Sequence, residues 1–153
     1  MTVDYKIIAK NLKFEGRAFI NGKYVDAIDG EKFENINPAT GEVLCAVSKC
    51  NHKDVDLAVK VSRKAFNSGI WSRTSPEFRK DVLLKFAELL RQTGEENSVL
   101  ECVDTGKLIG DCINEVANDA PMHFQWYGEL IDKVFGKVGP TEPSLTSLIV
   151  KEP

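Results

Sequence analysis

The sequence predicts a single α+β domain in which short antiparallel strands come first and amphipathic helices follow. An Asn21-Gly22 pair divides two strand-like runs, and a turn from Pro38 to Gly41 divides two more. From residue 51 onward, apolar residues recur at helical spacing. The length of 153 residues suits one ordinary domain, and 42% hydrophobic with 28% charged residues is a globular composition.

The strands are predicted in the first third of the chain, after a mixed stretch at 1–16 that either contains a short helix or frays. Asn21-Gly22 is typical of a tight hairpin turn, because both turn positions require φ > 0. Residues 29–37 read as a strand that Pro38 ends, since proline cannot donate to a ladder, and residues 43–49 read as the next strand. Together these runs predict a small antiparallel β-meander.

Four amphipathic helices are predicted after the meander. The first begins at the N-cap residue Asn51 and closes at Gly69. The second begins at Ser75, which is followed by a proline that suits the first helical position. The third opens on Thr93-Gly-Glu-Glu, which has the form of a capping box, and ends at Gly106.

The fourth helix is expected over roughly 108–135, with a kink at Pro121, because proline removes a hydrogen bond and clashes with the preceding turn. A loop follows, and then the β-prone run "LTSLIV" at 145–150, for which the sequence indicates no antiparallel partner nearby. The apolar stripes of the helices also exceed what so few strands can cover. We therefore expect more chain, or another subunit, to cover these surfaces.

The inventory of catalytic motifs is thin, because the sequence contains no glycine-rich phosphate loop, no nucleophile elbow and no zinc-protease motif. Cys50 and His52 lack a second pair of ligands at zinc spacing. Cys102 reads as a core cysteine rather than a nucleophile, since no histidine is near it in sequence. Trp126 and Tyr127 either stack a ligand or belong to the core.

Composition and charge indicate the cellular location to expect and the classes of partner that are not expected. The net charge of −3 argues against a nucleic-acid partner. No apolar run approaches the ~18 residues that span a bilayer, so no membrane partner is expected. No signal peptide is visible, and a cytoplasmic location is the default expectation.

Seven motifs follow one another along the chain: "FINGKYVDA", "FENINPATGEVLCAVSKC", "DVDLAVKVSRKAF", "SPEFRKDVLLKFAELL" after a tryptophan, "ECVDTGK", "QWYGELIDKVFG" and "LIVKEP". Their order and spacing resemble the N-terminal segment of the NAD(P)-dependent aldehyde dehydrogenases. The resemblance covers nearly the whole chain, from about Phe19 to Pro153, and looks closest to enzymes for gamma-glutamyl-aminobutyraldehyde, other aminoaldehydes or betaine aldehyde.

The resemblance implies an α/β fold of the aldehyde dehydrogenase type, of which this chain would be the N-terminal part. It implies an N-terminal extension at 1–16, part of the NAD(P)-binding domain at 17–139 and the first strand of an oligomerisation hairpin at 140–153. The catalytic domain would be absent, so no catalytic or cofactor-binding residue is assigned, and the segment alone is expected to be inactive. The full-length enzyme would oxidise a small aldehyde with NAD or NADP through a cysteine thiohemiacetal, as a homo-oligomer, either dimer or tetramer.

The resemblance also implies two sites within the chain. Val116 and Asp119 match positions that face the substrate tunnel, with Trp126 close by. Backbone carbonyls of Asn35 and Ile36 with the carboxylate of Asp104 match a monovalent cation site for Na+ or K+, which is sensible chemistry for a hard cation. For Asp104, a role in capping a turn stays open beside the cation. For the whole chain, a short non-enzymatic binding or assembly module, docking through its helices and terminal strand, stays open as the alternative function.

Overall fold

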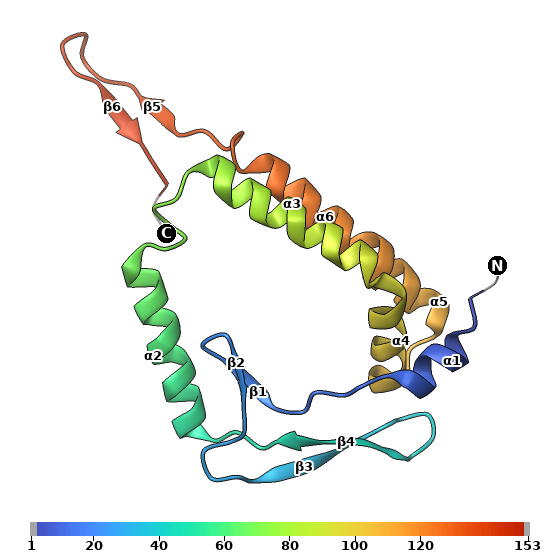
Figure 1. Cartoon of the computed structure of the whole chain (residues 1–153). Helices are drawn as coiled ribbons and strands as arrows, with labels where there is room; N and C mark the ends of the chain where they lie inside the picture. The colour runs from blue at the N-terminus through green and yellow to red at the C-terminus, as the bar shows by residue number, and fades with distance from the viewer. Residues whose placement is uncertain (1–2, 152–153) are drawn as a thin grey trace.

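The computed structural model describes residues 3–151, whose helices and small sheets follow one another around an open centre (Figure 1). The α3–α6 pair forms one side of this arrangement, α2 another and the first two sheets a third, while the β5–β6 hairpin projects outward. In chain order the elements are α1 (Tyr5–Asn11), β1 (Ala18–Ile20), β2 (Lys23–Val25), β3 (Lys32–Ile36), β4 (Val43–Ser48), α2 (His52–Ser68), α3 (Pro76–Gln92), α4 (Gly94–Thr105), α5 (Ile109–Cys112), the π-helix η1 (Ile113–Asp119), α6 (Ala120–Leu130), β5 (Lys137–Gly139) and β6 (Ser147–Ile149).

The strands form separate two-stranded antiparallel sheets, β1–β2 and β3–β4, so the prediction of one continuous meander is wrong. The predicted tight turn is confirmed, with φ of 54° at Asn21 and 73° at Gly22. β2 and β3 do not pair, because the segment between them turns at Ala27, whose carbonyl accepts the Gly30 N–H at 2.8 Å. Just beyond Ala27, the Ile28 N–H donates to a side chain of α2 instead of to a strand.

The Asn-Pro turn predicted between β3 and β4 is confirmed. Asn37 organises it, because its side-chain oxygen accepts the Ala39 N–H at 2.8 Å and its carbonyl accepts the Gly41 N–H at 2.8 Å. Gly41 has φ of 75°, a left-handed conformation that glycine adopts without strain.

Most of the predicted helix ends are confirmed, since they depend on short-range chemistry. Asn51 caps α2 within a complete capping box, Gly69 closes it in the left-handed conformation, and Ser75 caps α3. The capping box predicted at Thr93 is wrong. α3 and α4 follow each other there almost without a break, and the Thr93 hydroxyl donates back to the Leu89 carbonyl at 3.1 Å instead of capping α4.

The predicted fourth helix is present but consists of α5, η1 and α6 in succession, and it ends at Leu130 rather than near residue 135. Around Pro121 the helix widens, because the Ala120 N–H bonds to the Glu115 carbonyl five residues back. A widened turn relieves the clash between a proline ring and the carbonyl four residues earlier. The expected disturbance at Pro121 therefore takes the form of a π-helix.

The last strand has a partner within the chain, so the expectation that it lacks one is wrong. β6 pairs antiparallel with β5, with Lys137 opposite Ile149 and Gly139 opposite Ser147. The predicted loop after the fourth helix contains β5, a strand too short to give an alternating pattern. The run at 145–150 thus contributes the second strand of the projecting hairpin rather than the first.

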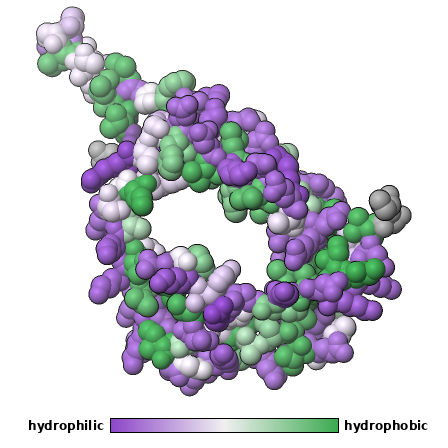
Figure 2. Space-filling view, viewed as in Figure 1, coloured by the Kyte–Doolittle hydropathy of each residue, from purple (hydrophilic) through white to green (hydrophobic). Residues whose placement is uncertain are grey.

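The expected excess of apolar surface is confirmed. The molecule exposes 11736 Å², whereas a compact monomer of its 17.0 kDa mass exposes about 7,700 Å², an excess of about 4,000 Å². On α2, Val55, Val59 and Phe66 are 57%, 60% and 47% exposed. The space-filling view shows an opening through the centre of the molecule rather than a sealed core (Figure 2).

Candidate functional site

The structure brings two of the three residues predicted for a cation site, Asn35 and Asp104, into contact through the Asn35 side chain. The Asn35 amide, on β3, donates to Asp104 Oδ1, at the end of α4, at 2.5 Å across 69 positions of sequence. The turn after Asp104 packs on the Asn-Pro turn, since a Cβ added to Gly106 would lie 2.9 Å from Pro38 Cγ. Two turns far apart in the chain are thereby held in contact.

The strand β3 is irregular at the two residues whose carbonyl oxygens are predicted to bind the cation. The β3–β4 register shifts between Asn35 and Ile36, so one residue of β4 is left without an opposite partner. Asp104 supplies one carboxylate, and no group of three or more His, Cys, Asp or Glu side chains that could hold a metal occurs within residues 3–151. Carbonyl oxygens with one carboxylate are a donor set for a hard cation of low charge and not for a transition metal.

A groove of about 580 Å³ opens beside this contact. Asn35 and Asp104 line it together with Tyr24 of β2, Cys45 of β4 and Glu96 of α4. The predicted cation site is therefore open at one side, next to a carboxylate that could attract a cation.

The residues predicted for the substrate tunnel lie along η1 and α6. Val116 and Asp119 belong to η1, where Val116 is half-buried and Asp119 is exposed. Trp126 lies seven residues beyond Asp119 on α6, close to two turns, and is 60% exposed. Between them, the His123 ring nitrogen Nδ1 forms a hydrogen bond with the Asp119 carbonyl at 2.8 Å.

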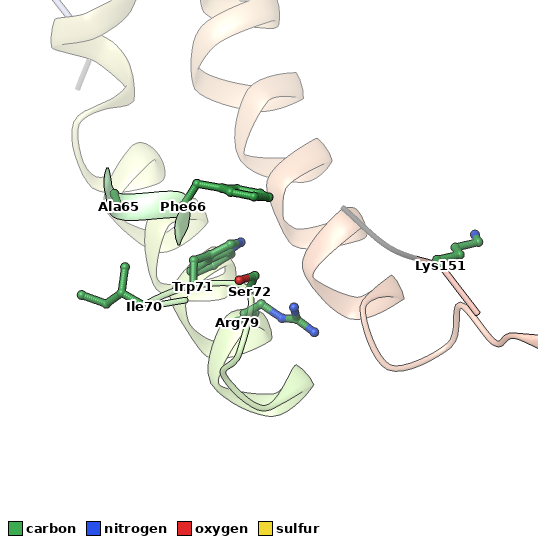
Figure 3. A pocket seen from close by; sticks show the side chains of 7 residues that line it. All are labelled: Ala65, Phe66, Ile70, Trp71, Ser72, Arg79 and Lys151. Atoms are coloured by element: carbon green, nitrogen blue, oxygen red, sulfur yellow. The ribbon is translucent and has the colours of Figure 1, made fainter. Parts of the chain in front are cut away.

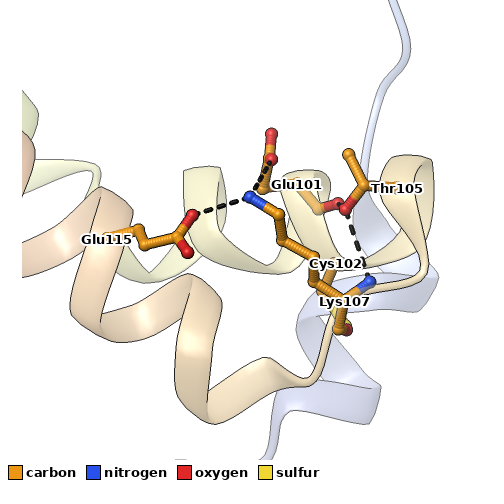
Figure 4. Close-up of polar contacts among 5 residues, drawn as sticks. All are labelled: Glu101, Cys102, Thr105, Lys107 and Glu115. Carbon is orange, nitrogen blue, oxygen red and sulfur yellow. Dashed lines mark hydrogen bonds and ion pairs between the residues drawn. The ribbon is translucent and has the colours of Figure 1, made fainter.

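A charged network that the sequence reasoning did not assign joins α4 to η1 (Figure 4). Lys107 Nζ lies 2.7 Å from Glu115 Oε2 and 3.3 Å from Glu101 Oε1. The hydrogen bonds to Glu115 and Glu101 raise the pKa of the Lys107 ammonium. Lys107 belongs to the quoted "ECVDTGK" motif, but the motif does not indicate that Glu115 would lie within reach.

Cys50 and Cys112 do not have the environment of an activated nucleophile. Cys102 Sγ donates to the Lys107 carbonyl at 3.1 Å. Cys112 is buried, and burial raises the pKa of its thiol. Burial and the nearby carboxylates of Asp54 and Asp29 raise the pKa of the Cys50 thiol. A raised pKa lowers the fraction of reactive thiolate, so Cys50 and Cys112 are poor nucleophiles.

A second hollow, of about 620 Å³, lies where α2 connects to α3 (Figure 3). Phe66 and Trp71 form its apolar side, while Arg79 and, from beyond β6, Lys151 supply its charge. None of the residues predicted for a site lies in it. Across residues 3–151, every helix is too short or too polar to cross a bilayer.

The chain resembles known proteins along almost its whole length. The family model described as "Aldehyde dehydrogenase family" matches residues 24–153. Aminoacetaldehyde dehydrogenase from Pseudomonas aeruginosa is 39% identical over 150 residues, which cover 98% of this chain and 30% of that protein.

Solved structures give the same result in three dimensions. The indole-3-acetaldehyde dehydrogenase AldA of P. syringae, in complex with NAD+, superposes with a TM-score of 0.90 at 41% identity, covering 95% of this chain and 29% of that one. Gamma-glutamyl-gamma-aminobutyraldehyde dehydrogenase from Burkholderia cenocepacia does so with a TM-score of 0.90 at 41% identity, covering 94% and 29%. This chain thus spans about 30% of the length of these three relatives.

Proposed function

The chain belongs to the aldehyde dehydrogenase family, and on that premise we propose that it forms the N-terminal part of an enzyme that oxidises an aldehyde to a carboxylic acid with NAD+ or NADP+. The predicted family and the predicted likeness to aminoaldehyde enzymes are confirmed. The observation that carries the proposal is the TM-score of 0.90 over 95% of the chain with an enzyme solved in complex with NAD+.

In this proposal the 153 residues support the dinucleotide-binding domain structurally and line one side of the substrate tunnel. The nucleophile, the general base and the dinucleotide site lie in other parts of the enzyme. The dinucleotide, when bound there, supplies the hydride acceptor. The exposed apolar side chains of α2 support such a role, because a large exposed apolar patch marks a surface that another part of a protein covers. Residues 17–139 would pack on the rest of the dinucleotide-binding domain. Residues 140–153 contain β6, and the hairpin that β6 forms with β5 would join subunits of a homo-oligomer.

We assign Val116, Asp119 and Trp126 to the substrate side of this enzyme, and propose a positively charged amino- or ammonio-aldehyde as the substrate class. An exposed carboxylate attracts an ammonium group, and an exposed indole face binds a cation by its quadrupole. The relative named for aminoacetaldehyde, whose amino group is protonated at neutral pH, supports this class. The relative named for indole-3-acetaldehyde provides the neutral compound to compare it with.

The test measures NADH formation from aminoacetaldehyde and from indole-3-acetaldehyde with the enzyme that carries this chain. We expect Asp119→Asn to lower kcat/KM for the cationic aldehyde about tenfold, equivalent to about 1.4 kcal/mol, and to leave the neutral aldehyde unchanged. Asp111→Asn, an exposed carboxylate on α5, serves as the matched control. Equal losses for both aldehydes would contradict the charge assignment, and an enzyme inactive with every aldehyde would contradict the proposed function.

The Asn35–Asp104 contact is proposed as a Na+ or K+ site, with carbonyl oxygens of Asn35 and Ile36 and the carboxylate of Asp104 as ligands. The register shift in the β3–β4 ladder and the open groove support it. We expect K+ or Na+ to raise the Tm of the protein relative to choline at equal ionic strength, and Asp104→Asn to remove the difference. If the two cations and choline act alike, Asp104 has only the role of closing its turn on Asn35.

The alternative function is a binding or assembly module, and the same exposed helix faces favour it. Such a module would dock on a partner through its helices and terminal strand, without any aldehyde-dependent reduction of NAD+ or NADP+. The activity measurement, made with both dinucleotides, separates the two functions, because only the enzyme reduces one of them.

A further inference from the structure

The π-helix η1 is the least regular part of the long helix and carries two of the three substrate-side residues. A π-helix is rare and occurs mostly as a single widened turn inside an α-helix, so we expect its geometry to be maintained by its surroundings. On one side, Ala117 is held by α4, since a Cβ added to Gly94 would lie 2.9 Å from Ala117 Cβ. At its end, the fully buried Pro121 has no N–H to donate and its ring would clash with the carbonyl four residues earlier, which disfavours a regular α-helical turn at this point.

Lys107 holds η1 from another direction (Figure 4). Glu115 is bound twice, because its carbonyl accepts the Ala120 N–H that defines the widened turn and its carboxylate lies 2.7 Å from Lys107 Nζ. Lys107 is in turn fixed by Glu101 at 3.3 Å and by the Thr105 hydroxyl, which accepts the Lys107 N–H at 3.4 Å. The residue after this doubly bound glutamate is Val116.

We propose that Lys107 is a positioning residue, which acts through Glu115 to fix the orientation of η1 and with it the substrate-side residues Val116 and Asp119. This inference rests on the proposed function, because it assigns a reason for the Lys107 network within that enzyme. Lys107 does not belong to the predicted substrate wall itself. Its removal is expected to misplace Val116 and Asp119 without removing any group that meets the aldehyde.

The expected signature is a change in binding rather than in chemistry. Because the substrate wall would be displaced while the reacting groups stay in place, Lys107→Met should raise KM for aminoacetaldehyde about two- to fivefold and leave kcat unchanged. Lys107→Arg keeps the positive charge and should restore KM. Lys49→Met removes a comparably exposed lysine, 3.0 Å from Glu31 on the β3–β4 side, and should leave KM unchanged.

A double-variant comparison tests whether the effect passes through Glu115. If it does, Glu115→Gln should reproduce the Lys107→Met change, and the two together should be no worse than either alone. Additive losses would overturn the proposal. So would a Lys107→Met variant with unchanged KM, or one in which the arginine variant fails to restore it.

Hydrogen exchange followed by mass spectrometry separates this inference from the proposed function. Lys107→Met should speed exchange of the amides at 113–120, whereas Lys49→Met should not. Should the enzyme that carries this chain, without any substitution, oxidise no aldehyde, the proposed function would be overturned, and exchange alone would decide whether Lys107 holds η1. Unchanged exchange at 113–120 would overturn the inference in either case.

Discussion

Removing the Asp54 carboxylate should weaken the attachment of α2 to the segment after β2, because this buried side chain makes two hydrogen bonds there, beside the bond from the Asn51 amide to Asp29 Oδ2 at 2.7 Å. Asp54 is only 3% exposed. Its Oδ1 accepts the Ile28 N–H at 2.9 Å and its Oδ2 accepts the Asn51 N–H at 2.9 Å. The first bond joins α2 to the segment after β2, and the second completes the helix cap.

The magnitude follows from these two bonds. A hydrogen bond to a charged acceptor contributes about 1.5–3 kcal/mol, so Asp54→Ala should lower the free energy of unfolding by about 3 kcal/mol or more. Asp54→Asn keeps one acceptor and should lose about half as much. Asp56→Ala, on an exposed position of the same helix, should change stability by less than about 0.5 kcal/mol.

Urea denaturation followed by far-UV circular dichroism measures these differences, and hydrogen exchange of the Ile28 and Asn51 amides locates them. Both amides should exchange faster in Asp54→Ala. Equal urea midpoints for the Asp54→Ala and Asp56→Ala variants would refute the reasoning, since the buried carboxylate would then contribute no more to stability than the exposed one.

Three further predictions concern other parts of the chain. Hydrogen bonds from Arg17 lower the pKa of Glu15 from the ordinary 4.5 to about 2. This pair therefore stabilises the folded state above pH 4.5 and loses its effect as the pH falls toward 2. Arg17→Met should return the pKa of Glu15 toward 4.5, as measured by NMR titration. Gly16→Ala should destabilise the protein by about 2–3 kcal/mol in the urea assay, because the added Cβ would lie 2.1 Å from the Ala46 carbonyl oxygen, whereas Gly110→Ala meets nothing within 4 Å and should stabilise by about 0.5 kcal/mol. Cys112 should resist iodoacetamide in the folded protein and react in urea, since burial both covers the thiol and raises its pKa; labelling at equal rates in the two conditions would contradict its burial.

Features that depend on a few neighbouring residues could be predicted from the sequence. Asn21-Gly22 requires positive φ, Asn51 offers a side-chain oxygen to the first turn of α2, and Gly69 permits the left-handed end of that helix. Thr93 fits the same kind of local rule but fails it, because the preceding helix uses its hydroxyl first. A local sequence pattern can therefore predict the wrong cap where two neighbouring helices can both bind the same hydroxyl, as α3 and α4 can bind that of Thr93.

The candidate sites were predicted by resemblance and could not be assembled from the sequence alone. Asn35 and Asp104 are 69 positions apart, and nothing in either run indicates that the amide of one reaches the carboxylate of the other. Lys107 and Glu115 are only eight positions apart, yet the chain reverses between them. Contact between such residues depends on how whole elements pack.

By itself the sequence determined the turns at Asn21-Gly22 and after Asn37 and the caps of α2 and α3, because each follows from the conformational limits of one or two residues. Only the tertiary structure decided that β2 and β3 stay apart, that β5 pairs with β6, and that Pro121 is accommodated by a π-helix next to Gly94 and Lys107. Each of these strands and charged side chains has several possible partners in the sequence. The packing of the helices and sheets against one another decides which partner comes within bonding distance.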